Sequence, residues 1–294
     1  MYRTRGRVYS STMISVSADL AAHPAPLEYW FFKVHSDDLA FLVDFIVRRT
    51  TGQAETRVSL WVRGRGRVAR AYADAWHTDS GITIANNVLD ARHSVGVVDD
   101  IDWNLSYEVL HGRAAPSALF INRLHPFDLE AVSRPRVAFA GHVTVSGERF
   151  DLSDAAGSLS HYWGRRLADR WHWIHANSFE GKDLTVEASV LWTRLWGRRP
   201  HLFGGYVWTY QDGQERMVVS PMTGLITFKG TLDDYCLVAR GWGHATRMHC
   251  ATTPERYNDL GEGIQQTLLG SCTVGNSGVV DVRAGVEYRV RPVP

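Results

Sequence analysis

Cysteine is scarce in this sequence, and no two cysteines lie close together along the chain. Cys236, Cys250 and Cys272 are the only three among 294 residues, and they form no CxxC pair. An odd number of widely spaced thiols argues against a disulfide framework and against a cysteine-based zinc site. Because such cysteine usage is typical of a reducing compartment, we expect a cytoplasmic location.

Long apolar runs are absent as well. No stretch reaches the length of about 20 apolar residues that a membrane-spanning helix needs, so we expect no integral membrane segment. The first 20 residues are basic but contain no continuous apolar core. We therefore expect neither a signal peptide nor a lipid anchor.

Neither sign of charge predominates. The chain has 32 Lys and Arg against 31 Asp and Glu, which gives a net charge of +1, and the two signs are interspersed. This balance excludes a global field that would attract nucleic acid or an anionic membrane surface. We therefore expect no nucleic-acid partner.

Several motifs of well-known catalytic sites are also missing. The sequence contains no HExxH, no P-loop and no GxSxG, which argues against zinc proteases, P-loop nucleotide hydrolases and α/β-hydrolases. A zinc site built from His161, His172 and His175 is disfavoured, because a spacing of three in a strand places His172 and His175 on opposite faces. We expect no metal and no cofactor.

What the sequence does contain is a long series of short strand-like segments. Residues 28–35 and 39–49 predict a hairpin, because apolar side chains alternate regularly along the second segment. A second hairpin is expected over 136–145 and 149–152. The other candidate strands are 57–63, 68–76, 81–88, 94–98, 102–110, 118–122, 184–192, 201–211, 215–219, 224–229, 236–241, 246–250, 263–274 and 279–291.

This series predicts an all-β protein. Regular short strands with few helix signals are typical of antiparallel sandwiches and barrels. A length of 294 residues exceeds the usual size of one domain, so we expect two β-domains. The turn-rich segment 151–157 indicates a boundary near residue 150, which divides the chain into 1–150 and 151–294.

Aromatic and titratable side chains are concentrated between residues 157 and 179. Fifteen residues of this stretch contain six of them: His161, Trp163, Trp171, His172, Trp173 and His175. Read as a strand with a period of two, one face carries Trp171, Trp173, His175, Asn177 and Phe179. Two aromatic-rich strands joined by residues 164–170 therefore predict two indoles and two imidazoles around one cavity. For any single one of these residues, a satisfied core position is the alternative.

Two short motifs resemble those of a known group. Residues 28–32 (EYWFF) resemble the EWWYF opening of the AttH and carotenoid 1,2-hydratase (hydroxyneurosporene synthase) group. About 130 residues later, residues 161–164 (HYWG) resemble its HxWG element, and a WxW pair, Trp171 and Trp173, follows. The resemblance implies two lipocalin-like (calycin) antiparallel β-barrels in tandem, and a site that includes His161 and Trp163.

Glu187 and His161 are the expected catalytic residues. Glu187 lies at about the distance where the resembling group has an acidic residue, and it is the acidic residue of the strand that follows the aromatic cluster. A carboxyl in an apolar pocket stays protonated and acts as an acid, and indole faces stabilise a developing cation. The expected substrate-binding residues are Trp163, Trp171, Trp173, His175, Asn177, Trp208, Tyr210, Glu28 and Trp30.

Three functions fit such a site. The first is an enzyme that cyclises or hydrates a large apolar isoprenoid or polyketide intermediate by acid and electrostatic catalysis. The second is a Diels–Alderase-type pericyclase, since lipocalin-like tandem barrels resembling this group host such cycloadditions. The third is a non-catalytic lipophile-binding protein. The expected partner is a large apolar small molecule, and the oligomeric state stays open, with a homodimer as one option.

Overall fold

The structure of the chain is a computed structural model, which describes residues 16–79, 81–115, 130–165, 167–193, 201–275 and 280–290. Within these residues, the helices are the four-residue α1 (Val16–Asp19) and a 3₁₀ turn, η3 (Pro254–Arg256). None of the described helices is long and apolar enough to cross a membrane. The remaining elements are strands, so the prediction of an all-β protein is confirmed.

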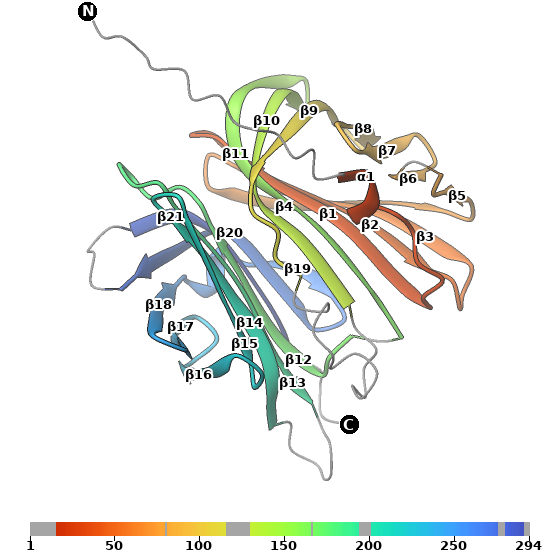
Figure 1. Cartoon of the computed structure of the whole chain (residues 1–294). Coiled ribbons are helices and arrows are strands. Elements are labelled where there is room, and N and C mark those ends of the chain that lie inside the picture. The colour runs from red at the N-terminus through yellow and green to blue at the C-terminus, as the bar shows by residue number, and fades with distance from the viewer. Residues whose placement is uncertain are drawn as a thin grey trace, which may run out of the picture.

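The first eleven strands form one antiparallel sheet that curls into a nearly closed barrel (Figure 1). Their order across the sheet is β4-β3-β2-β1-β11-β10-β9-β8-β7-β6-β5. Their bounds are β1 (Leu27–His35), β2 (Leu39–Arg48), β3 (Gln53–Val62), β4 (Arg65–Ala73), β5 (Trp76–His77), β6 (Gly81–Ile84), β7 (Asn87–Asp90), β8 (His93–Val98), β9 (Ile101–His111), β10 (Glu130–Val145) and β11 (Glu148–Gly164).

The next ten strands form a second antiparallel sheet and a second nearly closed barrel. The order is β15-β14-β13-β12-β21-β20-β18-β17-β16, with β19 paired to β20. The bounds are β12 (Arg170–Ala176), β13 (Leu184–Thr193), β14 (His201–Gln211), β15 (Gln214–Ser220), β16 (Gly224–Gly230), β17 (Asp234–Gly241), β18 (His244–Ala251), β19 (Asn258–Gly261), β20 (Ile264–Val274) and β21 (Val280–Val290).

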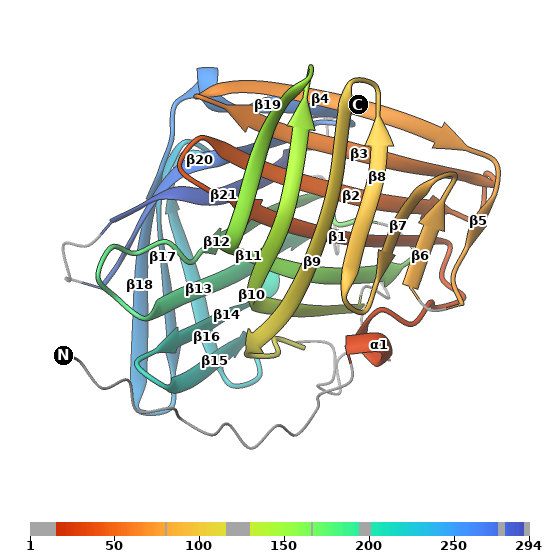
Figure 2. The same cartoon turned by 90° about the horizontal axis from the view of Figure 1, so that it is seen from above.

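Both predicted hairpins are confirmed. Strand β1 pairs with β2 along its whole length, and β10 pairs with β11. These four strands lie next to one another in the first sheet (Figure 2). The predicted strand 118–122 lies outside the described residues.

We expected a boundary near residue 150. The chain passes from the first sheet to the second later than that. Strand β11 belongs entirely to the first sheet, where it pairs with β1 and β10, and the second sheet begins only at Arg170. The small residues 153–157, which resemble a turn, form the middle of this long strand instead. A β-carbon at Gly157 would lie 2.1 Å from the carbonyl oxygen of Lys33, so the glycine serves close packing of adjacent backbones and not a turn.

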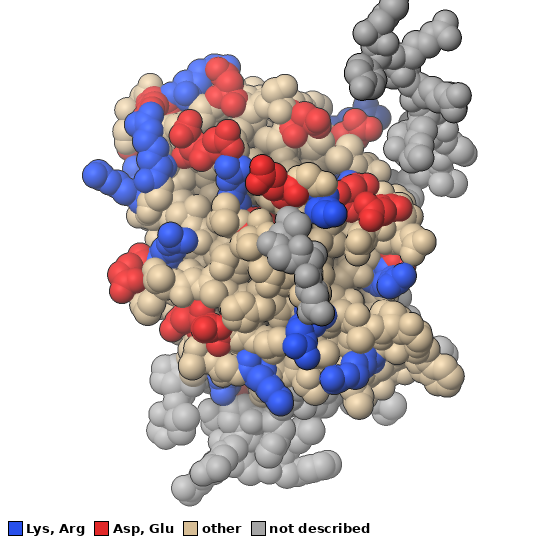
Figure 3. Space-filling view, turned by 90° about the vertical axis from the view of Figure 1, so that its left-hand side faces the viewer, with Lys and Arg blue, Asp and Glu red and all other residues tan. Residues whose placement is uncertain are grey.

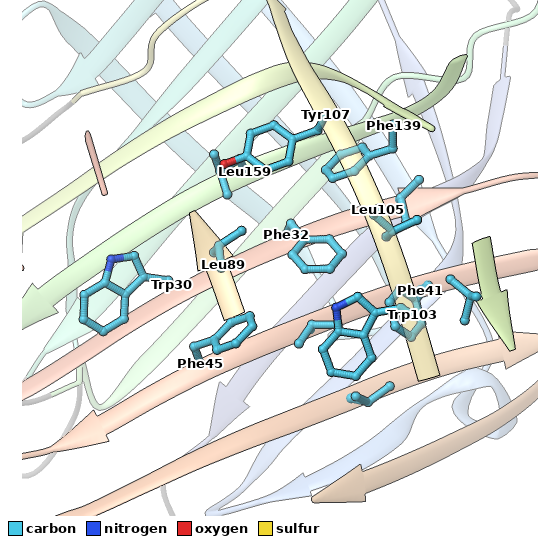
Figure 4. Packing of buried hydrophobic residues seen from close by; sticks show 14 of the residues in the cluster. Trp30, Phe32, Phe41, Phe45, Leu89, Trp103, Leu105, Tyr107, Phe139 and Leu159 are labelled. Atoms are coloured by element: carbon cyan, nitrogen blue, oxygen red, sulfur yellow. The ribbon is translucent and has the colours of Figure 1, made fainter. Parts of the chain in front are cut away.

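Each barrel has its own hydrophobic core. Inside the first barrel, Trp30, Phe32, Phe41, Trp103 and Phe139 pack together (Figure 4). Inside the second barrel the core includes residues of alternate positions on β12 and β13, among them Ile174 and Val186. The interior of each barrel is therefore filled mainly by the apolar face of its strands.

The barrels pack against each other through the outer faces of their strands. Strand β1 alternates between Trp30 and Phe32, which point into the first core, and Phe31 and Lys33, which contact the second barrel. Strand β2 is buried over nine of its ten residues, because one of its faces lies on the first core and the other faces the second barrel. By contrast, the outer surface in Figure 3 carries basic and acidic side chains interspersed.

Candidate functional site

A cavity of about 80 Å³ lies between the two barrels. Strands β1, β2, β3 and β11 of the first barrel contribute Tyr29, Phe31, Leu42, Asp44, Arg57 and Tyr162. The second barrel contributes Trp171, Trp173, Ser189, Leu191, Ile264, Gln266 and Glu287, and the connection between the sheets contributes Leu167 and Ala168. The cavity therefore exists only where the two barrels meet.

Aromatic rings form much of its wall. The ring of Phe31 meets Trp173 edge-on at 5.5 Å between centroids and lies 5.7 Å from Tyr162. The indoles of Trp171 and Trp173 are both buried. These quadrupolar faces suit an apolar ligand and a positive charge that develops on it.

One buried ion pair faces the cavity. Arg57 Nε donates to Asp44 Oδ2 at 2.8 Å, and both side chains are buried. Burial raises the pKa of Asp44, and the neighbouring Arg57 guanidinium opposes this rise. The pair brings a carboxyl group and a fixed positive charge to an otherwise apolar wall.

A second carboxyl, Glu287, lines the cavity from β21. Its Oε1 accepts a hydrogen bond from Trp171 Nε1 at 2.8 Å, and its Oε2 accepts one from Gln266 Nε2 at 2.7 Å. Burial raises the pKa of Glu287, the charge of Asp44 raises it further, and Arg57 lowers it. Two carboxyl groups thus share one guanidinium, which favours keeping a proton on one of them.

Two tyrosines add neutral hydroxyl groups to the lining. Burial raises the pKa of Tyr29 and of Tyr162, so both remain phenols and can donate hydrogen bonds. The Tyr162 hydroxyl lies 3.5 Å from the Tyr206 hydroxyl, and Tyr29 also lines the cavity. Both phenols are therefore candidate donors to a bound molecule.

Glu187 lies in the same interface but does not line the cavity. It is fully buried, and its oxygens accept hydrogen bonds from Ser133 Oγ at 2.6 Å and Tyr206 Oη at 2.5 Å. Burial raises the pKa of Glu187, while these two hydrogen bonds lower it. The carboxyl reaches the cavity through the hydroxyl groups of Tyr206 and Tyr162 and through Trp173, whose indole also lowers the pKa of Glu187.

His161 faces the opposite way, into the end of the first barrel. Its Nδ1 donates to the carbonyl oxygen of Asp19 at 2.8 Å, and its Nε2 lies 2.9 Å from Glu28 Oε1. The ring stacks on Trp30 at 4.6 Å and lies 4.7 Å from the ring of Trp163. Four of the predicted site residues are therefore together, but apart from the cavity.

The cluster around His161 and Glu28 attaches the segment before β1 to the first barrel. Glu28 Oε1 also accepts from the backbone N–H of His23 at 2.8 Å, and Glu28 Oε2 pairs with Arg49 at 2.7 Å. The His23 ring stacks on Trp163 at 3.8 Å. The HYWG motif thus holds this segment against β11, and the alternation along β11 sends Tyr162, not His161, to the cavity.

The remaining predicted binding residues connect the barrels without lining the cavity. His175 Nε2 donates to the carbonyl oxygen of Pro135 at 2.8 Å, and Asn177 Nδ2 donates to that of Gly157 at 3.1 Å. Trp208 packs against Ala114 and Tyr206, and the Arg136 guanidinium lies 3.8 Å from the centre of the Tyr210 ring.

A buried lysine also links the two barrels. Lys33 of β1 donates to the carbonyl oxygens of His175 at 3.1 Å and Arg283 at 2.9 Å. Burial lowers the pKa of Lys33 to about 8. Burial also lowers the pKa of His175, and the nearby Lys33 charge lowers it further.

The sequence therefore identified two of the cavity residues, Trp171 and Trp173, but missed its acids. Asp44 could have been noticed as a lone carboxylate inside the apolar strand 39–48. Glu287 had no such signal, because its strand also contains Arg283 and Arg289 and so does not read as an apolar strand. Among the described residues, no group of three His, Cys, Asp or Glu side chains could hold a metal ion.

Comparison by sequence finds only limited similarity to known proteins. No protein-family model matches the chain. Two uncharacterized proteins of Mycobacterium tuberculosis, from strains CDC 1551 / Oshkosh and ATCC 25618 / H37Rv, are each 29% identical to it over 124 residues. The match covers 41% of this chain and only 35% of each relative.

Solved structures match along nearly the whole chain. An AttH-type protein from Nitrosomonas europaea has a TM-score of 0.64 at 14% identity, covering 99% of this chain and 100% of its own. Kievitone hydratase from Nectria haematococca has a TM-score of 0.66 at 11% identity, covering 95% and 93%. At these identities the likeness concerns the fold alone. The chain therefore has the same fold as these two proteins, with two nearly closed antiparallel β-barrels in tandem.

Proposed function

We propose that the chain is a hydratase-type enzyme that adds water to a carbon–carbon double bond held in the cavity between the barrels. The observation that carries this proposal is Glu287, a carboxyl group with a raised pKa at an aromatic-walled cavity. An acid of this kind protonates an alkene that is too weakly basic for water at neutral pH. The fold shared with kievitone hydratase supports the same class of reaction.

The proposed reaction uses the cavity's own side chains. Glu287 transfers its proton to one alkene carbon, and the cation that forms on the other carbon faces the indoles of Trp171 and Trp173. A water molecule adds its oxygen to that carbon and gives up a proton to Asp44, whose carboxylate is held by Arg57. Transfer of this proton back to Glu287 restores the starting state, so no redox partner is consumed.

We propose supporting roles for the two residues first expected to be catalytic. Glu187 orients Tyr206, and through it the Tyr162 hydroxyl at the cavity. His161 holds the segment before β1 in place through Asp19 and Glu28. Both act on the shape of the site and do not touch the reacting atoms.

The size of the cavity bears on the substrate. A volume of about 80 Å³ is small beside the roughly 300–1,000 Å³ of pockets that enclose drug-sized ligands. We propose that the cavity receives the reacting alkene group, and that the rest of an isoprenoid or polyketide substrate lies outside it. The Tyr29 hydroxyl offers a hydrogen bond to an oxygen atom of such a substrate.

The test is incubation with isoprenoid and polyketide alkenes in ¹⁸O-labelled water, followed by mass spectrometry. Hydration predicts a product heavier by one labelled water, absent with Glu287→Gln. A rearranged product without label would favour cyclisation or a Diels–Alderase-type cycloaddition. Tight binding of the same compounds without any product would favour a lipophile-binding protein.

A further inference from the structure

The second barrel contains a separate cluster of aromatic and polar side chains at the end where β12 begins. His172 points into this barrel and is almost completely buried. Four rings surround it at 4.6 to 5.7 Å between centroids: Trp192, Phe228, Tyr235 and Tyr288. We call these five residues the barrel-end cup. It lies on the opposite face of β12 from Trp171 and the cavity between the barrels.

The cup contains polar atoms without partners. Neither ring nitrogen of His172 has a hydrogen-bond partner among the described residues. Arg170, two residues before His172, lies with its guanidinium 5.6 Å from the centre of the Trp192 ring, and its buried Nε is also unpartnered. Buried polar groups in native proteins are nearly always hydrogen-bonded. Several unpartnered polar atoms in one place therefore indicate that another molecule supplies their hydrogen bonds.

Three of the cup's aromatic side chains reach the molecular surface. Tyr235 and His172 are buried, but the rings of Trp192, Phe228 and Tyr288 are only partly buried. Trp192 and Phe228 meet at 90° with centroids 5.3 Å apart, while Phe228 and Tyr235 stack at 4.8 Å. Flat rings in this arrangement offer faces and edges to another flat ring.

We infer that the barrel-end cup binds a flat aromatic carboxylate that also carries a hydroxyl group. The aromatic part packs among Trp192, Phe228 and Tyr288, and the carboxylate pairs with Arg170. The hydroxyl bonds to His172, which as a neutral imidazole offers one donor and one acceptor. Burial, together with the Arg170 charge, lowers the pKa of His172 to about 3, so the imidazole is neutral at physiological pH.

The position of the cup separates it from the proposed reaction. Trp171 and His172 are consecutive in sequence and point to opposite faces of the same strand, one to the interbarrel cavity and one to the cup. Variants at these two positions therefore form a matched pair. The inference does not depend on the proposed hydration.

The experiment is titration of the purified full chain with 6-hydroxy-2-naphthoate, followed by calorimetry. Wild type is expected to bind one equivalent saturably. His172→Phe and Arg170→Gln should each weaken binding about tenfold or more, because each removes a hydrogen bond in a desolvated place. Trp171→Phe should leave the affinity within about twofold, since its ring lies on the other face of the strand.

A second measurement keeps the test independent of the folding of the variants. In wild-type protein labelled with ¹⁵N-histidine, the probe should shift the ring nitrogen signals of His172 more than those of any other histidine. Absence of saturable binding would overturn the inference. So would binding that Trp171→Phe weakens but His172→Phe and Arg170→Gln leave unchanged.

Discussion

Trp171 donates a hydrogen bond from its indole Nε1 to Glu287 Oε1 over 2.8 Å, across the adjacent strands β12 and β21. The same indole is part of the wall of the cavity between the barrels. One side chain therefore both encloses the cavity and orients its acid. Because this hydrogen bond stabilises the ionised carboxylate, it limits how far burial raises the pKa of Glu287.

Trp171→Phe should move the pH dependence of turnover. Loss of the hydrogen bond raises the pKa of Glu287 further, by about one unit for a bond worth roughly 1.4 kcal/mol. Since the acid works while protonated, the alkaline limb of the kcat profile should shift to higher pH. An unchanged limb would mean that the indole does not hold the catalytic acid.

Arg57→Met should destabilise the protein by about 3–5 kcal/mol, because it leaves the Asp44 carboxylate buried without its partner. The double variant Asp44→Leu/Arg57→Met removes both charges and should recover most of that loss. Urea unfolding of the two variants measures the difference. Equal losses in both would argue against an ionised pair at this position.

His172 should make stability depend on pH. In the unfolded chain a histidine titrates near its ordinary pKa of 6.5, whereas burial lowers the pKa of folded His172 to about 3. Between these values the unfolded state binds a proton that the folded state does not. The contribution of His172 is therefore fully present above pH 6.5 and falls by about 1.4 kcal/mol per unit as the pH drops through this window.

Unfolding free energies from pH 7 to pH 5 test this dependence. His172→Phe should flatten the slope by about one proton. If this variant kept the wild-type slope, His172 would not remain neutral in the folded protein.

Gly157→Ala should cost roughly 1–3 kcal/mol through overpacking. The added methyl group would lie 2.1 Å from the carbonyl oxygen of Lys33 and 2.6 Å from the ring of Phe139. Gly147→Ala provides a control, because nothing lies within 4 Å there and only its φ of +83° opposes the change. Thermal unfolding showing the larger loss at Gly147 would contradict the packing argument.

The sequence predicted the fold well because alternation along a strand is a local property. The hairpin of β1 and β2 and the aromatic face of β12 both follow from a period of two. The expectation of a boundary near residue 150 relied on small residues such as Gly157, which occur both in turns and where backbones pack closely.

The candidate site was harder to predict because it depends on which face of each strand meets the other barrel. Alternation places His161 and Tyr162 on opposite faces of β11, but it does not say which face turns outward to a second barrel. Glu287 and Asp44 come from strands about 240 residues apart in sequence, and only tertiary packing brings them to one cavity.

The most direct test of the proposed reaction compares two carboxylic acids of the same interface, Glu287 and Glu187. Only Glu287 lines the cavity, so Glu287→Gln should lower kcat for hydration by about 10² or more while ligand affinity persists. Glu187→Gln should lower it by less than about tenfold, because Glu187 lies outside the cavity lining and acts only through the side chains that it hydrogen-bonds. Near-wild-type turnover in Glu287→Gln, with loss of turnover in Glu187→Gln, would contradict the assignment of Glu287 as the acid.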